Sequence, residues 1–259
     1  MHLFFGYHDL ATIFVLVISF VTSQQVSANV HSGGWNLKPK TTAIVTGGTK
    51  GIGHAIVTEL GKTFGCHILT CARNETELAA YLKDCKEQNM HVEGVVADVS
   101  TKEGLDKLME KADKFIQEHG DGTLDILVNN VGTNIRKPTI DYTEEDLDFI
   151  LRTNLKSMYE LTKRCHPYLK RKDDSKSTTS VVNIGSVAGV TCMKSGTPYA
   201  ATKAAMNQLT GNWACEWGPD GIRVNCVTPW YINTPLAQQV LKNEEYARYV
   251  YILSYYVFF

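Results

Sequence analysis

The sequence predicts an α/β fold built on a single doubly wound parallel sheet with helices on both faces. Two patterns indicate it: short apolar runs rich in Val, Ile and Leu, and helix-forming stretches between them. Strands that are buried on both faces lack clean alternation of apolar and polar residues. Strands that alternate with helices are typical of a parallel sheet. The length of 259 residues fits one large domain of this class.

Six apolar runs are the expected strands, and a glycine within the third weakens it. In chain order they are residues 42–46, 66–71, 92–97, 124–129, 180–184 and 223–227. The expected helices lie between them, at residues 52–64, 75–88, 102–118 and 199–217. A further helix is expected to begin after Thr143, an N-cap residue followed by three acids. Gly218-Pro219 is expected to end the last helix, and residues 170–179 to form an exposed loop.

The two ends of the chain differ from the predicted domain at residues 35–246. Residues 1–34 form a hydrophobic extension, in which residues 10–21 have the length of a signal-peptide core, although no Lys or Arg precedes them. Two interpretations stay open: the secretory route, if residues 1–28 act as a signal peptide, or an appended segment outside the fold. Residues 247–259 form an atypical aromatic tail, either an exposed aggregation-prone segment or a strand.

The composition argues against several classes of function. The formal net charge is −1, so neither a nucleic-acid partner nor an anionic membrane surface is expected. The sequence contains no His-Glu-x-x-His and no Cys-x-x-Cys, so we expect no metal site. The seven cysteines are an odd number, and several lie in apolar runs. Buried reduced thiols are therefore expected, with Cys192 among them.

A glycine-rich turn joins the first expected strand to the first expected helix. Thr46 to Gly53 contains four glycines in eight residues. Glycine lets the backbone approach a phosphate closely, and a helix N-terminus offers N–H groups and the positive end of a dipole. A tight turn without a ligand is the alternative, which the number of glycines disfavours. The turn indicates a Rossmann-type sheet, and its candidate cofactor contacts are Gly47, Thr49, Lys50, Gly51, Ile52 and Gly53.

Two cations near this turn indicate which nucleotide it binds. NAD-specific sites usually place an acid at the end of the second strand, where it binds the ribose 2′-hydroxyl. Here Thr70, Cys71 and Ala72 occupy that place. Arg73 follows directly and can bind a 2′-phosphate bidentately, with Lys50 as the second cation. Either cation alone is equally a solvent-exposed side chain, but the missing acid and the two cations together favour NADP(H).

Three residues have the chemistry of a proton-transfer site. Tyr199 and Lys203 share one face of a predicted helix because they are four residues apart, and Ser186 follows the fifth strand. Hydride delivery to a ketone leaves a developing alkoxide, to which Ser186 and Tyr199 can each offer a hydroxyl proton. An ammonium about 4 Å from the phenolate stabilises it by on the order of 4 kcal/mol at an effective dielectric of ~20. We therefore predict that Lys203 lowers the pKa of Tyr199.

Asn154 is a poor helix former within an expected helix. It is either a surface or kink residue, or a residue that holds a water between Lys203 and solvent. Ser186 and Tyr199 also have ordinary structural explanations when each is taken alone, as a turn serine and a half-buried aromatic. The order of glycine turn, serine and Tyr-x-x-x-Lys makes the set specific.

Taken in order, these motifs resemble those of the classical short-chain dehydrogenases/reductases over residues 36–246. Further support comes from Asp98-Val99 after the third strand, Asn129 to Gly132 after the fourth, and Pro229 to Thr234 after the sixth. The resemblance implies a catalytic set of Asn154, Ser186, Tyr199 and Lys203. It also implies cofactor contacts from Asp98, Val99, Asn130, Gly132, Lys203, Ile232 and Thr234.

Within that family, segments such as Ala-Met-Asn-Gln-Leu-Thr and Pro-Trp-Tyr-Ile-Asn-Thr-Pro-Leu are similar to plant tropinone reductases and their homologues. This resemblance implies NADP(H)-dependent reduction of a small cyclic ketone to an alcohol in plant secondary metabolism. It also implies a cytoplasmic location and the capacity to form homo-oligomers. After Tyr246 the chain departs from the family, because the aromatic tail replaces the last strand. We therefore expect the seventh strand to be missing or replaced, with reduced stability and impaired activity.

Two other functions stay open. A truncated, catalytically impaired product would bind the nucleotide without turnover, so only a turnover measurement separates it from an active reductase. A nucleotide-sugar epimerase also uses Tyr-x-x-x-Lys. Its glycine turn, however, places glycine where Lys50 stands, and its chains are usually longer.

Overall fold

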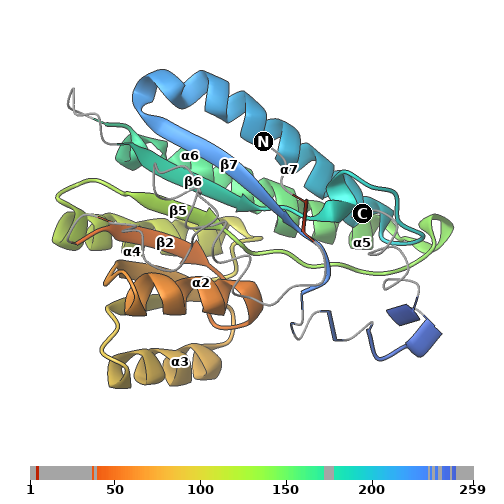
Figure 1. Cartoon of the computed structure of the whole chain (residues 1–259), viewed down its shortest axis with the longest axis horizontal. Helices are drawn as coiled ribbons and strands as arrows, with labels where there is room; N and C mark the ends of the chain where they lie inside the picture. The colour runs from red at the N-terminus through yellow and green to blue at the C-terminus, as the bar shows by residue number, and fades with distance from the viewer. Residues whose placement is uncertain are drawn as a thin grey trace.

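A parallel sheet forms the centre of the chain, with helices on both of its faces (Figure 1). The structure, a computed structural model, describes residues 4–5, 37, 40–171, 178–232, 234, 237–238, 241–245 and 247–248. The six long strands are β2 (Thr42–Thr46), β3 (His67–Ala72), β4 (Val92–Val96), β5 (Ile126–Asn129), β6 (Thr179–Ile184) and β7 (Ile222–Pro229). They confirm the six predicted strands, with small shifts at the ends.

The strand order explains where a ligand can bind. The long strands lie in the order β7-β6-β5-β2-β3-β4, and β2 pairs in parallel with β3 on one side and β5 on the other. The chain therefore adds β3 and β4 on one side of β2 and then crosses to the other side of β2 to form β5. In doubly wound sheets the ligand crevice lies outside the carboxyl ends of the strands at such a point. The glycine turn follows β2 and Asn130 follows β5, so the topology brings them together.

The seventh position of the sheet is taken by a two-residue strand from the N-terminal extension, β1 (Phe4–Phe5). It pairs in parallel with the end of β7, where Phe4 lies opposite Thr228 and Phe5 opposite Pro229. The prediction of a missing or replaced seventh strand is confirmed as a replacement. Phe4 and Phe5 belong to the sheet, whereas the interpretations of the rest of residues 1–34 and of the tail from residue 249 fall outside the described residues.

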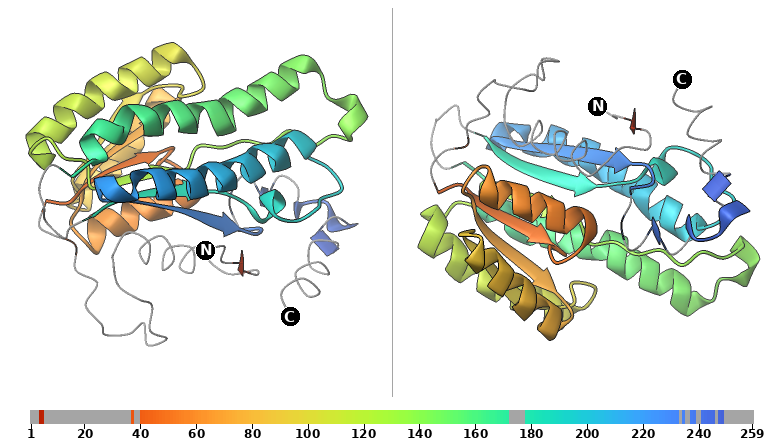
Figure 2. Two further views of the ribbon diagram at one scale, coloured as in Figure 1. Left: turned by 90° about the horizontal axis from the view of Figure 1, so that it is seen from above. Right: turned by 60° about the horizontal axis from the view of Figure 1, so that its bottom comes forward.

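Each face of the sheet has its own layer of helices (Figure 2). One layer contains α2 (Gly51–Lys62) and α3 (Glu75–Glu87), and the other α4 (Lys102–Gly120), α6 (Ser157–Leu169) and α7 (Thr197–Trp217). Ile44 of β2 packs with the second layer, and its neighbours Ala43 and Val45 pack with the first. Every residue of β2 is thus buried, which is why its sequence does not alternate.

Local signals explain where the helices begin. Thr143 caps α5 (Glu144–Leu151) in a capping box with Asp146, as predicted. A π-helical turn, Arg152–Lys156, joins α5 to α6, and shorter 3₁₀ turns are Thr139–Asp141, Val187–Gly189 and Gly218–Asp220. The last of these ends α7 at the predicted place. Among the described residues, no helix has both the length and the apolar character needed to cross a membrane.

The cysteines divide into two groups. Cys66, Cys71, Cys85, Cys165 and Cys226 are buried free thiols, as expected. The prediction that Cys192 is packed in the interior is wrong, because this thiol is exposed in the segment between β6 and α7, and Cys215 is exposed on α7.

Candidate active site

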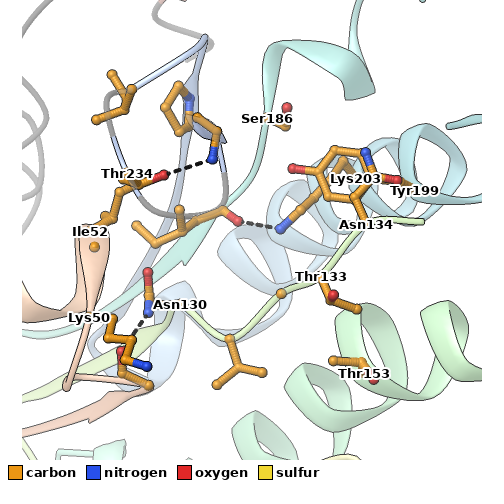
Figure 3. Close-up of a pocket in the computed structure, with 18 of the residues that line it drawn as sticks. Lys50, Ile52, Asn130, Thr133, Asn134, Thr153, Ser186, Tyr199, Lys203 and Thr234 are labelled. Atoms are coloured by element: carbon orange, nitrogen blue, oxygen red, sulfur yellow. Dashed lines mark hydrogen bonds between the residues drawn. The ribbon is translucent and has the colours of Figure 1, made fainter. Parts of the chain in front are cut away.

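A cavity of about 910 Å³ opens at the carboxyl ends of the strands, and residues that end or follow all six long strands line it (Figure 3). All of the predicted site residues except Gly53 and Asn154 lie on its wall. Those present are Gly47, Thr49, Lys50, Gly51, Ile52, Arg73, Asp98, Val99, Asn130, Gly132, Ser186, Tyr199, Lys203, Ile232 and Thr234. The structure therefore brings together residues that are up to 187 positions apart, from Gly47 to Thr234.

The backbone of the glycine turn accounts for its glycines. Gly47 and Gly51 have φ angles of 69° and 57°, in the left-handed region that favours glycine. The N–H of Gly48 donates to Thr70 Oγ1 at 2.9 Å, and a Cβ on Gly48 would stand 2.4 Å from that oxygen. A Cβ on Gly53 would stand 2.2 Å from the carbonyl oxygen of Gly47. Gly53 thus closes the turn by packing against it, and it does not line the cavity.

Asn130 and Thr46 fix the turn to the end of β5. The Asn130 amide donates to the carbonyl oxygens of Thr46 and Gly47 at 2.8 and 3.2 Å. In return, Thr46 Oγ1 accepts from the N–H groups of Asn130 and Val131 at 3.0 and 3.1 Å. Asn130 therefore lines the cavity and also holds the turn in place. Thr46, the first residue of the turn motif, is a supporting residue to which the motif assigned no role.

The two predicted cations both lie at the end of the cavity near β3. The Lys50 ammonium is 2.7 Å from Glu77 Oε1, and the two side chains are 59% and 42% exposed. An exposed ion pair of this kind contributes only about 0–1 kcal/mol to stability, so Lys50 can exchange Glu77 for another anionic partner. Arg73 is exposed directly after β3. Glu77 was not predicted as a site residue, because its only sequence signal was its position in the first turn of α3.

Ser186, Tyr199 and Lys203 meet at the other end of the cavity (Figure 3). Ser186 Oγ accepts from the N–H of Ala188 at 3.1 Å, which leaves its own proton to donate elsewhere. Lys203 Nζ lies 5.7 Å from the centre of the Tyr199 ring and donates to the carbonyl oxygen of Ile184 at 2.6 Å. The helical spacing thus places the phenol and the ammonium side by side, as predicted.

The pKa of Tyr199 differs from the prediction. Burial raises the pKa of Tyr199, although the hydrogen bond with Ser186 and the charge of Arg136 act in the opposite direction. Burial also lowers the pKa of Lys203 to about 8. The prediction that Lys203 lowers the pKa of Tyr199 is wrong here, because desolvation dominates and the ammonium is directed at the Ile184 carbonyl.

Asn154 lies in the π-helical turn and is completely buried, so the interpretation as a surface residue is wrong. Its amide donates to Thr133 O at 2.9 Å and to Thr202 Oγ1 at 3.2 Å, and its Oδ1 accepts from Thr133 N at 2.8 Å. Both amide protons are therefore used to fasten the segment after β5 to α7. Asn154 thus supports the wall of the cavity without lining the cavity itself.

The end of the cavity near Tyr199 also contains residues to which the sequence motifs assigned no role. Arg136 Nη1 donates to Tyr231 Oη at 3.1 Å, and the guanidinium lies 5.6 Å from the centre of the Tyr231 ring. Met193, Trp230 and Ala237 add apolar surface beside them. The only sequence signal for Arg136 was its place after the fourth strand, at the edge of the sheet where ligands bind.

Comparisons with known proteins identify the family. Residues 41–245 match the family model described as short chain dehydrogenase. The chain therefore belongs to the short-chain dehydrogenase/reductase family, which consists of oxidoreductases that bind NAD(P) and act on small molecules.

Individual relatives show which members of the family this chain is similar to. A tropinone reductase homolog from Arabidopsis thaliana is 47% identical over 216 residues, which cover 83% of this chain and 78% of that protein. Among solved structures, an actinorhodin polyketide ketoreductase variant with NADPH has a TM-score of 0.70 at 28% identity and covers 81% of this chain and 78% of its own. A putative short-chain alcohol dehydrogenase from Sinorhizobium meliloti has a TM-score of 0.71 at 27% identity, covering 82% and 79%. The chain is thus similar to tropinone reductase homologs.

Proposed function

We propose that this protein is an NADP(H)-dependent carbonyl reductase that converts the ketone of a small cyclic molecule into an alcohol. The observation that carries the proposal is a single cavity with a glycine turn at one end and Ser186, Tyr199 and Lys203 at the other. A nucleotide bound along this cavity would have its phosphates at the turn and its nicotinamide near the phenol. When bound, the nicotinamide supplies a hydride.

The residues that line the cavity fit this nucleotide. The glycines of the turn leave room that a Cβ would fill, and α2 presents its N-terminus there. Arg73 and Lys50 would bind the 2′-phosphate, and Asp98 and Val99 would flank the adenine. The remaining contacts would come from Asn130, Gly132, Lys203, Ile232 and Thr234.

The proton chemistry follows from the state of the phenol. Because burial raises the pKa of Tyr199, the phenol is protonated at neutral pH and is able to donate a proton to the developing alkoxide. The Ser186 hydroxyl would donate a second hydrogen bond to the same oxygen. Lys203 would bind the ribose and supply a positive charge beside the phenol. Asn154 would act as a positioning residue through Thr133 and Thr202.

Initial rates of NADPH and NADH oxidation with a panel of cyclic ketones test this proposal. We expect turnover with NADPH to be preferred. Arg73→Ser should raise KM for NADPH by about 10–100-fold, because a charge-assisted contact is worth roughly 1.5–3 kcal/mol, and should leave KM for NADH unchanged. Lys83→Ser is the matched control, because Lys83 is an exposed cation of α3 that lies off the cavity wall and is 3.9 Å from Glu87.

The outcomes separate the alternatives. Preference for NADH would contradict the assignment of NADP(H). NADPH binding without oxidation by any ketone would favour the catalytically impaired nucleotide-binding protein instead.

A further inference from the structure

We propose that the substrate is a ketone with an anionic group, such as a carboxylate, and that Arg136 binds this group. The inference rests on the proposed ketone reduction and adds the charge class of the substrate. It starts from the arrangement of Arg136 and Tyr231, a pair to which the sequence motifs assigned no role.

Arg136 is held at the edge of the cavity by contacts with a second segment. It follows β5, whereas Tyr231 follows β7, and both residues line the cavity. The hydrogen bond of 3.1 Å to the Tyr231 hydroxyl and the cation–π contact at 5.6 Å from the centre of its ring hold the guanidinium against Tyr231. Tyr231 is only 8% exposed, so it is itself fixed by packing. A planar guanidinium held in this way is suited to bidentate binding of a carboxylate.

Charge is distributed unevenly along the cavity. Among the described residues that line it, the acids are Glu77 and Asp98, which follow β3 and β4 at the nucleotide end. Glu77 pairs with Lys50, and Asp98 accepts hydrogen bonds from Ser100. The nucleotide end also contains the cations Lys50 and Arg73, so charges of both signs lie there. The opposite end contains the cations Arg136 and Lys203 and, among the described lining residues, no acid. A substrate anion is therefore attracted to this end, and a substrate cation is repelled.

The charge of Arg136 also acts on Tyr199, because it partly offsets the rise in the pKa of Tyr199 that burial causes. Arg136 and Tyr199 both line the cavity, so one small molecule bound there can contact both residues. The apolar side chains of Met193, Trp230 and Ala237 lie at the same end. The expected substrate is an apolar ring with the ketone at one position and the anionic group at another.

Three ring ketones of similar size provide the test: 4-oxocyclohexanecarboxylate, its neutral carboxamide and 4-(dimethylamino)cyclohexanone, which is cationic at neutral pH. We expect kcat/KM with saturating NADPH to be at least tenfold higher for the carboxylate than for the carboxamide, and lowest for the cation. Arg136→Gln should reduce the ratio of carboxylate to carboxamide to about one. Tyr231→Phe keeps the ring under the guanidinium but removes the hydroxyl, so the ratio should fall partially.

Lys137→Gln is the matched control, because it removes the adjacent cation, whose ammonium pairs with Asp146 of α5. It should leave the ratio unchanged. Equal loss of all three rates in Arg136→Gln would show that Arg136 only links the two segments, and would overturn the inference. A wild-type preference for the neutral or cationic ketone would also overturn it, and the proposed reductase function would stand in both cases.

If none of the ketones is reduced, the proposed function fails and the anion site is tested separately. The protein loaded with NADP⁺ is then titrated with cyclohexanecarboxylate and with cyclohexanecarboxamide, and tryptophan fluorescence is followed. Tighter binding of the carboxylate, lost in Arg136→Gln and kept in Lys137→Gln, would support the site. Equal binding of the two probes, or binding of neither, would overturn it.

Discussion

Lys203→Met separates the chemistry of the site from its stability. Lys203 is 3% exposed, and burial lowers its pKa from 10.5 to about 8. At about 1.4 kcal/mol per pH unit, this difference means that the charged form is about 3 kcal/mol less stable in the folded protein than in the unfolded chain. Methionine has a similar length and no charge, so the variant lacks this penalty.

The substitution also has a cost. The carbonyl oxygen of Ile184 loses the donor that now lies 2.6 Å away, at about 1–3 kcal/mol. The two effects nearly offset each other at pH 7, and we expect the free energy of unfolding of the variant to lie from about 0 to 2 kcal/mol above that of the wild type. The charged side chain of Lys203 thus adds no net stability to the folded protein at pH 7, as expected for a group with a function in the site.

The pH dependence of the stability difference between the two proteins tests the burial of this charge more directly than the difference at pH 7. Because the pKa of Lys203 is lower in the folded state, the unfolded chain binds more protons between pH 8 and 10.5, so wild-type stability rises with pH in this window. The advantage of the variant over the wild type should therefore shrink by about 2 kcal/mol between pH 7 and 9.5.

Urea denaturation of both proteins, in parallel at each pH, measures this difference. Burial raises the pKa values of the Cys66 and Cys165 thiols to about 12, and because Lys203 is not among the causes, these thiols affect both proteins equally and cancel. A difference in unfolding free energy that stays constant with pH, or a variant less stable by 2 kcal/mol or more at pH 7, would refute the argument that burial strains this charge.

Three further predictions concern the turn, the pH profile and the opposite end of the sheet. Gly53→Ala would place a Cβ 2.2 Å from Gly47 O, so urea denaturation should show a loss of about 1–3 kcal/mol, and unchanged stability would contradict the close packing. The kcat/KM for ketone reduction should fall as the pH rises through about 8, where Lys203 loses its proton, and a flat profile to pH 9.5 would exclude a required ammonium. Burial and two neighbouring histidines lower the pKa of His67, so the folded state binds fewer protons and stability should fall as the pH drops through about 6.5. His67→Gln should flatten that fall in thermal melts, and an equal slope would contradict this assignment.

The sequence was sufficient for the central sheet, because most of the long strands are buried on both faces and leave a continuous apolar run, whereas β4 at the sheet edge is only partly buried. Thr42–Thr46, for example, is buried throughout. The short strand Phe4–Phe5 could not be predicted, because two residues carry no periodicity and their pairing with the end of β7 depends on the folded sheet. The sequence indicated Asn154 as a possible kink residue, but the contact of its amide with the segment after β5 depends on the folded chain and could not be predicted.

The site was predictable where chemistry depends on spacing along the chain. Tyr199 and Lys203 are neighbours on one helix face, and the glycines follow from local backbone geometry. The direction of the Tyr199 pKa was not predictable, because it depends on how deeply the fold buries the phenol. Arg136 was missed for a related reason: its partner, Tyr231, is 95 residues away, and only the folded sheet brings them together.

The most direct test of the account is the rate of NADPH oxidation by Tyr199→Phe, measured together with NADPH affinity. We expect turnover to fall by about 10²–10⁴-fold, because a proton donor is lost, while the Kd for NADPH changes by less than about twofold. Tyr159→Phe is the control, since this tyrosine of α6 is 40% exposed and does not line the cavity. Wild-type turnover in Tyr199→Phe would show that the phenol is not the proton donor and would contradict the proposed chemistry.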